Sequence, residues 1–365
     1  MRILFRYVFR EFLVPLIYCL TGFLSIYVLF ELFGSFSRIM DAHPGFPATA
    51  RYFAGYVAPY FMYIAPACLM LAALYTMWSF CRHSELVAMR ASGIGFLEIV
   101  KPLLTAALLM AGFVAWVNEV YVPEHAPWAE AFRAARFHAD KMEVASNVVY
   151  HHARAGRTWS AGAAMTVDMT VLEDVTISEE HPDGGRSRTI KSPRAEHLDG
   201  EWWLHRPTFL RFSPDGKEIP TPTAEKDALS FQAFPEFDED PRDFALQNRK
   251  EAHYSVADRL RYLATHPQMD AVARRRMVYN TWSQTFAPLA CLIITLFAIP
   301  AGIATGRQSV FRGILGALGM FFSYYGLSIG CMSLAYVGWM PVIPAALLPH
   351  FVFFAVGIWM FRRHR

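Results

Sequence analysis

The sequence predicts an α-helical membrane protein with six transmembrane helices and an inserted all-β, jelly-roll-like domain. Three observations support this fold class. Of 365 residues, 54% are hydrophobic and only 18% are charged, which is outside the usual balance of soluble proteins. Six apolar stretches reach the length of about 20 residues that one helix needs to cross a bilayer. Between the third and fourth stretches, the pattern changes to the period of two that is typical of strands.

Each predicted span is a run of mainly apolar residues that ends at polar or charged ones. The first span follows Arg2, Arg6 and Arg10 and resembles a signal peptide at its start. It is too long for one and lacks a small-residue cleavage site, so we expect a retained helix. The six predicted spans are residues 12–34, 57–80, 99–117, 286–304, 314–337 and 342–361.

The distribution of Lys and Arg predicts the orientation, because short cytoplasmic segments carry an excess of both. The segments assigned to the inner side contain Arg2, Arg6, Arg10, Arg82, Arg90, Lys101, Arg307, Arg312, Arg362, Arg363 and Arg365. The short outer segments contain only Arg38 and Arg51. We therefore expect both termini in the cytoplasm and residues 119–286 on the outer side. The run from Arg274 to Arg276 departs from the rule, which holds poorly beside a long translocated domain.

The polar region between the third and fourth spans has the features of an antiparallel β domain. Apolar Met165, Val167, Met169 and Val171 alternate with polar residues, and turn signals recur at residues 182–185, 199–200 and 214–216. An edge strand of such a domain can pair with another β domain. The predicted domains are residues 1–125 with the first three spans, 140–250 for the β domain, 254–267 for a connecting helix and 275–365 with the last three spans. Ser255 and Asp258 predict a capping box for the connecting helix.

The sequence lacks the motifs of several enzyme classes. It has no P-loop, no H-E-x-x-H and no G-x-S-x-G, so we expect no catalytic residue and no cofactor in this chain. The five cysteines lie in or beside apolar runs, which argues against disulfides and a Cys-based zinc site. His151 and His152 are adjacent on a predicted strand and point to opposite faces, so we expect no metal there. A net charge of +3 gives no reason to expect nucleic acid.

The inner loop between the second and third spans predicts a short cytoplasmic helix near residues 83–93. Ser84 is placed to cap it, Glu85 falls in its first turn, and Gly93 is placed to end it. Two readings of Glu85 are open. It either complements the helix dipole or pairs with an arginine of a nucleotide-hydrolysing partner that docks on this helix.

This loop (SELVAMRASG, residues 84–93) resembles the coupling helix of the LptF/LptG permeases, which extract lipopolysaccharide from the inner membrane. Three further segments agree: NTWSQTFAPL (280–289), SYY (323–325) and PAALLP (344–349). The arrangement of three and three spans around a β domain also matches. The first two motifs resemble LptG more closely than LptF. The resemblance covers nearly the whole chain and is strongest in the membrane part.

The resemblance implies a non-hydrolytic subunit of an ABC transporter in the bacterial inner membrane, with a periplasmic β domain. The implied partners are the paralogous LptF or LptG subunit, a dimer of LptB-like ATPases that holds ATP and Mg, LptC- and LptA-like jelly-roll proteins, lipopolysaccharide and membrane lipid. Ser84, Glu85 and Arg90 match the region that contacts the ATPase. In the family, the first, second and fifth spans line the substrate cavity.

Two sets of residues are candidates for contact with the lipid. Arg38, near the outer end of the first span, and the run Arg274, Arg275 and Arg276 are candidates for its phosphates, since arginine binds phosphate bidentately. For the arginine run, a solvated helix face is the alternative. The candidate lining of the lipid cavity is Phe23, Ile26, Phe30, Phe321 and Tyr325.

Three further residues carry ionisable groups at or near membrane depth. His350, in the sixth span, is either functional or a neutral histidine bonded to a neighbouring helix. Glu31 and Glu119 lie near the outer ends of their spans, where we expect them to be solvated at the membrane interface.

Two rival functions remain. A membrane scaffold or sensor whose β domain binds partners would tolerate changes at Glu85. A membrane enzyme acting on lipids would need a cluster of titratable residues within the spans, and the predicted spans contain none.

Overall fold

The computed structural model describes residues 2–138, 145–152, 155–180, 185–213, 217–219, 230–266, 269–305 and 310–363. The predicted turns at 182–185 and 214–216 lie wholly or mostly outside these residues, as does Arg307. The chain divides into two compact units. One comprises residues 1–34, 57–122 and 255–365, and the other comprises residues 35–56 and 123–254.

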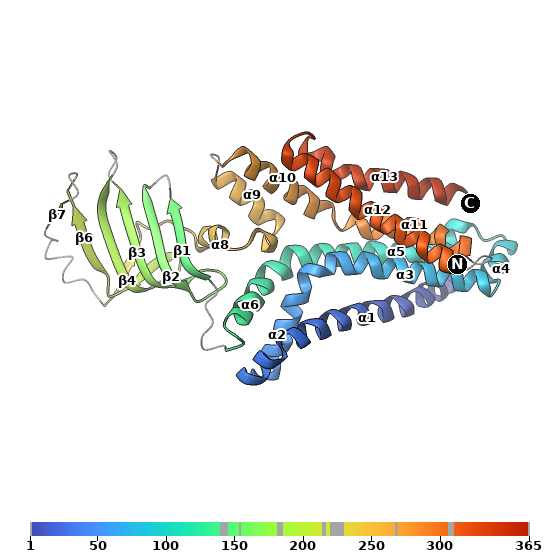
Figure 1. Ribbon diagram of the computed structural model, residues 1–365, viewed down its shortest axis with the longest axis horizontal. Coiled ribbons are helices and arrows are strands. Elements are labelled where there is room, and N and C mark those ends of the chain that lie inside the picture. Colours follow the sequence, from blue (N-terminus) through green and yellow to red (C-terminus); the bar gives the residue numbers. More distant parts are fainter. Residues whose placement is uncertain are drawn as a thin grey trace. The chain divides into compact units, whose positions relative to one another are not determined.

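The first unit is helical (Figure 1). Its helices, some of which extend into the second unit, are α1 (Arg2–Ala42), η1 (Ala58–Tyr60), α3 (Phe61–Arg82), α4 (Glu85–Ala91), α5 (Phe96–Trp116), the π-helix η2 (Val117–Tyr121), α9 (Val256–Thr265), α10 (Ala271–Phe286), α11 (Leu289–Thr305), α12 (Val310–Val337) and α13 (Val342–Arg363). The central helix is α11, which packs against α3, α5, α12 and α13. Gly302 permits its close approach to α3, because a Cβ atom there would lie 2.8 Å from Met77 Cβ.

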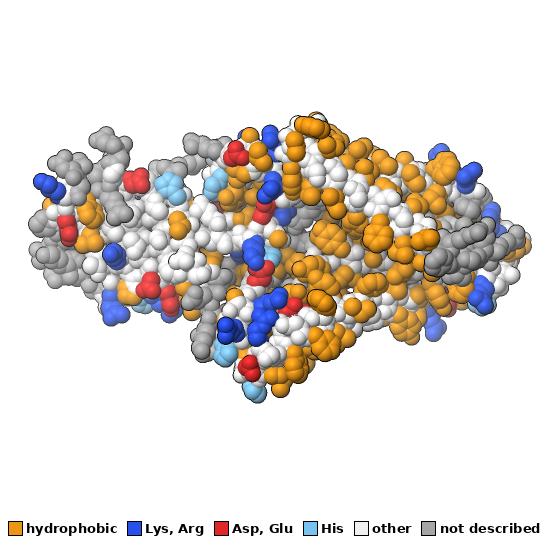
Figure 2. Space-filling model, viewed as in Figure 1, with side chains coloured by type: hydrophobic (Ala, Val, Ile, Leu, Met, Phe, Trp, Pro, Cys, Tyr) orange, Lys and Arg blue, Asp and Glu red, His pale blue; other side chains and the backbone are white. Residues whose placement is uncertain are grey.

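Five of these helical segments are long and apolar enough to cross a membrane, and a sixth span results if the bent pair α10 and α11 counts as one. The prediction of a multispan helical membrane protein is therefore confirmed, whereas the count of six stays a prediction. Hydrophobic side chains cover much of the helical surface visible in Figure 2. Among the exposed hydrophobic residues of α1 are Phe30 (81% exposed) and Ile26 (65% exposed). Such exposure is expected where lipid or another subunit covers the helices.

The fourth predicted span is broken near its start. Helices α10 and α11 meet at a bend of 53° around Pro288. Ala290 N–H donates to Ala287 O, so the carbonyl of Phe286 lacks the partner that a continuous helix would supply.

The second unit contains an antiparallel sheet of eight strands among the residues described, with α2 (Phe46–Val57), α6 (Val122–Ala134), α8 (Pro241–Asn248) and η4 (Glu251–His253). The strands are β1 (Ala145–His152), β2 (Arg157–Ala164), β3 (Val171–Glu180), β4 (Arg186–Leu198), β5 (Glu201–His205), β6 (Thr208–Phe212), β7 (Glu218–Ile219) and β8 (Phe231–Phe234). The order is β1-β2-β3-β4-β5-β8, and β6 pairs with β4 and β7. The inserted antiparallel β-sheet is thus confirmed, and its jelly-roll topology stays a prediction.

The alternating segment that predicted a strand around Met165 to Val171 is instead mostly the connection between β2 and β3. Residues 165–170 lie outside both strands, and Met169 has a left-handed backbone with φ 58°. Met169 is nevertheless fully buried, and Val171 begins β3. Met165 and Val167 are only half-buried, so the alternation in sequence does not reflect a strand with one buried face, and this prediction was wrong in its boundaries.

Aromatic side chains fill the core of the β domain, and α8 contributes one of them. The Phe244 ring lies 4.4 Å from that of Tyr150 and 5.3 Å from that of Trp159, measured between centroids. Trp202 packs on the same group, and all four side chains are buried. Helix α8 therefore belongs to the core of this unit.

The capping box predicted for the connecting helix is present in α9. Asp258 N–H donates to Ser255 Oγ at 3.0 Å, and Ser255 N–H donates to Asp258 Oδ2 at 3.1 Å. Two further amides of this first turn donate to Glu119 of η2, Val256 at 2.9 Å and Ala257 at 3.2 Å. Glu119, which is half-buried, thus caps α9, a role that was not predicted. Glu31 is only 4% exposed, so the expectation that it is solvated was wrong.

Candidate functional site

An apolar groove lies among α1, α3 and α12 in the helical unit. Its volume is about 530 Å³. The lining consists of Val14, Pro15, Tyr18 and Cys19 from α1, Leu71, Leu74, Tyr75 and Trp78 from α3, and Ile314 from α12. These helices contain the first, second and fifth predicted spans. A groove of this size and composition suits hydrocarbon chains.

The five predicted lining residues lie on two of the same helices but not in this groove. Phe23, Ile26 and Phe30 are exposed on α1, beyond the groove residues in sequence. Phe321 and Tyr325 pack on each other on α12, and the Tyr325 ring lies 5.9 Å from that of Tyr63 on α3. Their contact with lipid stays a prediction.

The short helix α4 follows α3 on the segment predicted to be cytoplasmic. Gly93, with φ 80°, ends it through two bonds of a Schellman motif: Gly93 N–H donates to Arg90 O and Ile94 N–H to Met89 O. The predicted cap at its start is wrong, because Ser84 has a left-handed backbone and its side chain makes no capping bond. Glu85 instead accepts a hydrogen bond of 2.6 Å at Oε2 from the Tyr7 hydroxyl.

A basic cavity of about 630 Å³ lies within the second unit. Its lining includes five cationic side chains and one carboxylate: Arg38, Arg133, Arg136, Arg249, Lys250 and Glu130. Lys250 Nζ lies 2.7 Å from Glu130 Oε2, and Arg249 is bonded to the carbonyl of Val167. The positive excess suits an anionic ligand with several oxygens.

Of these cations, the sequence pointed only to Arg38. The others lie on segments far apart in the chain: α6 and the turn after it, and the residues that follow α8. The spacing of Arg133 and Arg136, close to one helical turn, was a weak signal, and the Arg249-Lys250 pair was another.

Burial keeps His253, in the same cavity, in its neutral form. His253 is 6% exposed, and its Nε2 lies 3.5 Å from Glu130 Oε1. Desolvation lowers the pKa of His253 below its usual value, and Lys250 and Arg249 lower it further, while Glu130 opposes them. His253 is therefore a neutral member of the cavity near pH 7.

The geometry above, with its helical spans, its short helix after the second span and its β insert, agrees with one family. A model described as lipopolysaccharide export system permease LptF/LptG matches residues 6–363. The chain belongs to this family. The resemblance predicted from the motifs is thereby confirmed, and the match does not separate LptF from LptG. No curated protein sequence matches the chain significantly. The protein is an integral inner-membrane permease with a role in lipopolysaccharide export, and its family is not one of hydrolases.

The arginine run of this LptF/LptG permease lies on α10, and its members differ in surroundings. Arg276 lies over the Tyr336 ring, with Cζ 5.3 Å from the centroid. Arg275 packs against Gly338, and Arg274 is exposed. Two of the three guanidinium groups thus pack on residues at the end of α12 or just after it. Contact of the run with lipid phosphates stays a prediction.

His350 of the permease lies at the break between α10 and α11. Its Nε2 is 3.0 Å from the freed carbonyl of Phe286 and 3.2 Å from the Tyr324 hydroxyl. A neutral imidazole with its proton on Nε2 donates to that carbonyl. This contact supports the second of the two readings of His350, in which it is bonded to a neighbouring helix.

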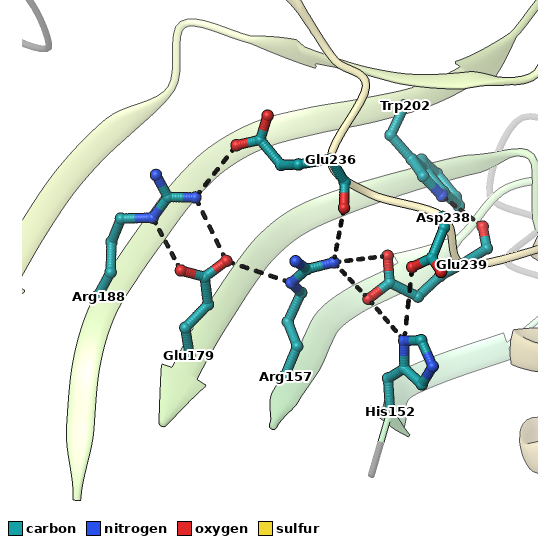
Figure 3. Close-up of polar contacts among 8 residues, drawn as sticks. All are labelled: His152, Arg157, Glu179, Arg188, Trp202, Glu236, Asp238 and Glu239. Carbon is teal, nitrogen blue, oxygen red and sulfur yellow. Dashed lines mark hydrogen bonds and ion pairs between the residues drawn. The ribbon is translucent and has the colours of Figure 1, made fainter. Parts of the chain in front are cut away.

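A polar cluster in the β domain joins the segment after β8 to the sheet (Figure 3). Arg157 Nη1 contacts both oxygens of the buried Glu239, at 2.8 and 3.0 Å. The Trp202 indole donates to the Glu239 carbonyl at 2.8 Å, and Arg188 contacts Glu179 and Glu236. This network attaches residues 236–239 to strands β2 to β5.

Within this cluster, His152, Asp238 and Glu239 have the composition of a metal site, with ligand atoms within 4.8 Å of one another. The guanidinium of Arg157 already neutralises Glu239, and His152 Nδ1 lies 3.4 Å from Glu239 Oε1. A cation bound to Glu239 would lie close to the positive charge of Arg157, so the ion pair explains the group better than a metal does.

Proposed function

We propose that this permease is the non-hydrolytic subunit of an ATP-driven ABC transporter. In this proposal, it takes lipopolysaccharide from the inner membrane and passes it to a periplasmic β bridge. The ATPase, with its ATP and Mg, is a separate LptB-like dimer, and a paralogous LptF or LptG subunit forms the other half. The motifs at residues 84–93 and 280–289 favour the LptG position for this chain.

The position of Glu85 is the observation that carries the proposal. Helix α4 connects α3 to α5, and its first residue is a partly exposed carboxylate. Tyr7 occupies Oε2, and Oε1 has no hydrogen bond among the residues described. Oε1 is thus open to an arginine of the ATPase. Ser84 and the exposed Arg90 lie at the two ends of the same helix, where we expect further contacts with the ATPase.

The chemistry of the two cavities suits the two parts of the substrate. The apolar groove of α1, α3 and α12 would hold acyl chains, and the basic cavity around Arg38 and Arg249 would hold phosphates. Differential affinity for the lipid in two states, switched through α4, would drive release. Both termini would lie in the cytoplasm and the β domain in the periplasm.

The β domain would pass the lipid to LptC- and LptA-like proteins by pairing of strands. The outer edge of β1 is already occupied. Asn248 Oδ1 accepts from Val149 N–H and its Nδ2 donates to Val149 O, both at 3.2 Å. Gln247 Oε1 accepts from His151 N–H at 3.4 Å. We therefore expect the bridge to form at another edge while α8 stays in place.

Purification from native membranes tests this proposal. Mass spectrometry of the purified complex should identify an ABC ATPase, a second six-span subunit and lipopolysaccharide. A stable protein without ATPase or lipid would instead favour the scaffold or sensor function.

The variant Glu85→Arg tests the coupling directly. Like charges would then face each other across the interface, and we expect lipopolysaccharide release to fall by about tenfold or more. The control is Glu98→Gln, which removes another partly exposed carboxylate, one whose side chain pairs with Lys101 on α5. Normal coupling in Glu85→Arg would contradict the proposal.

A further inference from the structure

Tyr7 of α1 contacts two other helices, α3 and α4. Its hydroxyl donates to Glu85 on α4, and its ring stacks on Phe80 near the end of α3, with centroids 6.0 Å apart. Tyr7 itself belongs to the second turn of α1 and is 41% exposed. Because the Tyr7 side chain is exposed, its orientation depends on the hydrogen bond to Glu85 as well as on packing. A bond from a hydroxyl to a carboxylate is about twice as strong as one between neutral groups.

The same part of α1 packs into the helical core. Val8 and Phe12 of α1 are fully buried, in one cluster with Met77 and Phe80 of α3. Pro15 has no N–H, so the carbonyl of Glu11 lacks its partner within the helix. The Thr76 hydroxyl of α3 lies 3.4 Å from this carbonyl but donates its one proton to the Ala72 carbonyl, at 2.8 Å. The segment of α1 before Pro15 is thus held by apolar contacts.

Beyond Leu16, α1 is less packed. Leu16 is 2% exposed and belongs to the same core, whereas Ile17 is 48% exposed and Tyr18 71% exposed. The apolar groove is lined by Val14, Pro15 and Tyr18 of this stretch. A proline inside a helix is a site where the helix bends. The packed part of α1 therefore ends within the stretch that lines the groove.

We propose that Tyr7 is a positioning residue that holds the Glu85 carboxylate and transmits movements of α4 through the first turns of α1 to the groove at Pro15. This inference rests on the proposed function, in which the ATPase moves α4. With Tyr7 on Oε2 and an arginine of the ATPase on Oε1, one carboxylate joins the ATPase to the helix that lines the groove. Rotation of α4 then pulls the start of α1, and the part after Pro15 changes its distance from α3.

The test compares Tyr7→Phe with the unmodified protein in the complete transporter, reconstituted in proteoliposomes. The phenyl ring keeps the stacking on Phe80 and loses the hydroxyl. ATP hydrolysis and release of labelled lipopolysaccharide are measured on the same samples. We expect ATPase binding to persist, and release per ATP hydrolysed to fall about fivefold or more. The control is Glu98→Gln, which should match the unmodified protein.

A double-variant experiment separates transmission from a structural role. If Tyr7 acts through Glu85, adding Tyr7→Phe to Glu85→Gln should lower release per ATP little further. Additive losses would overturn the inference, as would unchanged release per ATP in Tyr7→Phe while Glu85→Arg abolishes coupling. If the unmodified protein binds no ATPase, the proposed function fails, and this inference fails with it.

Discussion

The pKa of His253 makes the stability of the basic cavity depend on pH. Its pKa is lowered in the folded state, so the unfolded chain takes up the proton first as the pH falls. Its contribution to stability is fully present above the unfolded value of about 6.5 and is lost as the pH falls towards the folded value.

We therefore expect residues 249–254 to exchange amide hydrogens faster at about pH 5.5 than at about pH 7.5, after correction for intrinsic rates. His253→Gln removes the titrating group and should reduce this difference. Hydrogen exchange with mass spectrometry on the purified permease measures it. An equal pH effect in the variant would show that another group is responsible.

Phe244 provides a second prediction at the scale of one residue. Its side chain is fully buried among Tyr150, Trp159 and Trp202. Phe244→Ala should lower the free energy of unfolding of the β domain by about 3–5 kcal/mol, because it leaves a cavity. Denaturant unfolding followed by tryptophan fluorescence measures the loss. Leu198→Ala, at a side chain that is 44% exposed, is the control and should change stability much less.

Residue-level roles were only partly predictable, because they depend on contacts distant in sequence. Glu85 was singled out from its place in a short helix, but its bond to Tyr7, 78 residues away, left no sequence pattern. The cations of the basic cavity likewise come from separate segments. Arg38 was predicted because it follows an apolar span, and nothing in the sequence linked it to Arg249.

At the scale of elements, α8 protects the edge of the sheet. Asn248→Ala should leave the backbone N–H and C=O of Val149 without their hydrogen-bond partner. The amide of Val149 should then exchange faster, and self-association through β1 should increase, because unpaired edge strands recruit other strands. Asn248→Asp keeps the acceptor and should keep the amide protected. Hydrogen exchange and light scattering in detergent test both variants. Equal protection of Val149 in all three proteins would contradict this role of α8.

The helical spans were predictable from length and hydrophobicity, but the break before α11 was not. Pro15, Pro66 and Pro102 all lie inside continuous helices, whereas Pro288 separates two. His350 stabilises the break, because its Nε2 contacts the Phe286 carbonyl that the break leaves without a helical partner. A single sequence does not reveal which proline has such a partner. The connection between β2 and β3 was missed because its apolar and polar residues alternate as in a strand, although residues 165–170 lie outside both strands.

At the scale of the whole molecule, three features of the permease would serve the transport of one lipid. A partly exposed carboxylate on α4 would receive the ATPase, the groove beside Pro15 would hold acyl chains, and the basic cavity would hold phosphates. The family supplies the role in lipopolysaccharide export. The proposed function adds the ATPase as the source of energy.

The most direct test is ATP-dependent extraction of lipopolysaccharide from proteoliposomes that contain this permease, its partner subunit and the ATPase. We expect release of labelled lipopolysaccharide to a soluble jelly-roll acceptor with ATP and Mg, and little release without ATP or with Glu85→Arg. Release that is equal with and without ATP, or unchanged in Glu85→Arg, would contradict the account.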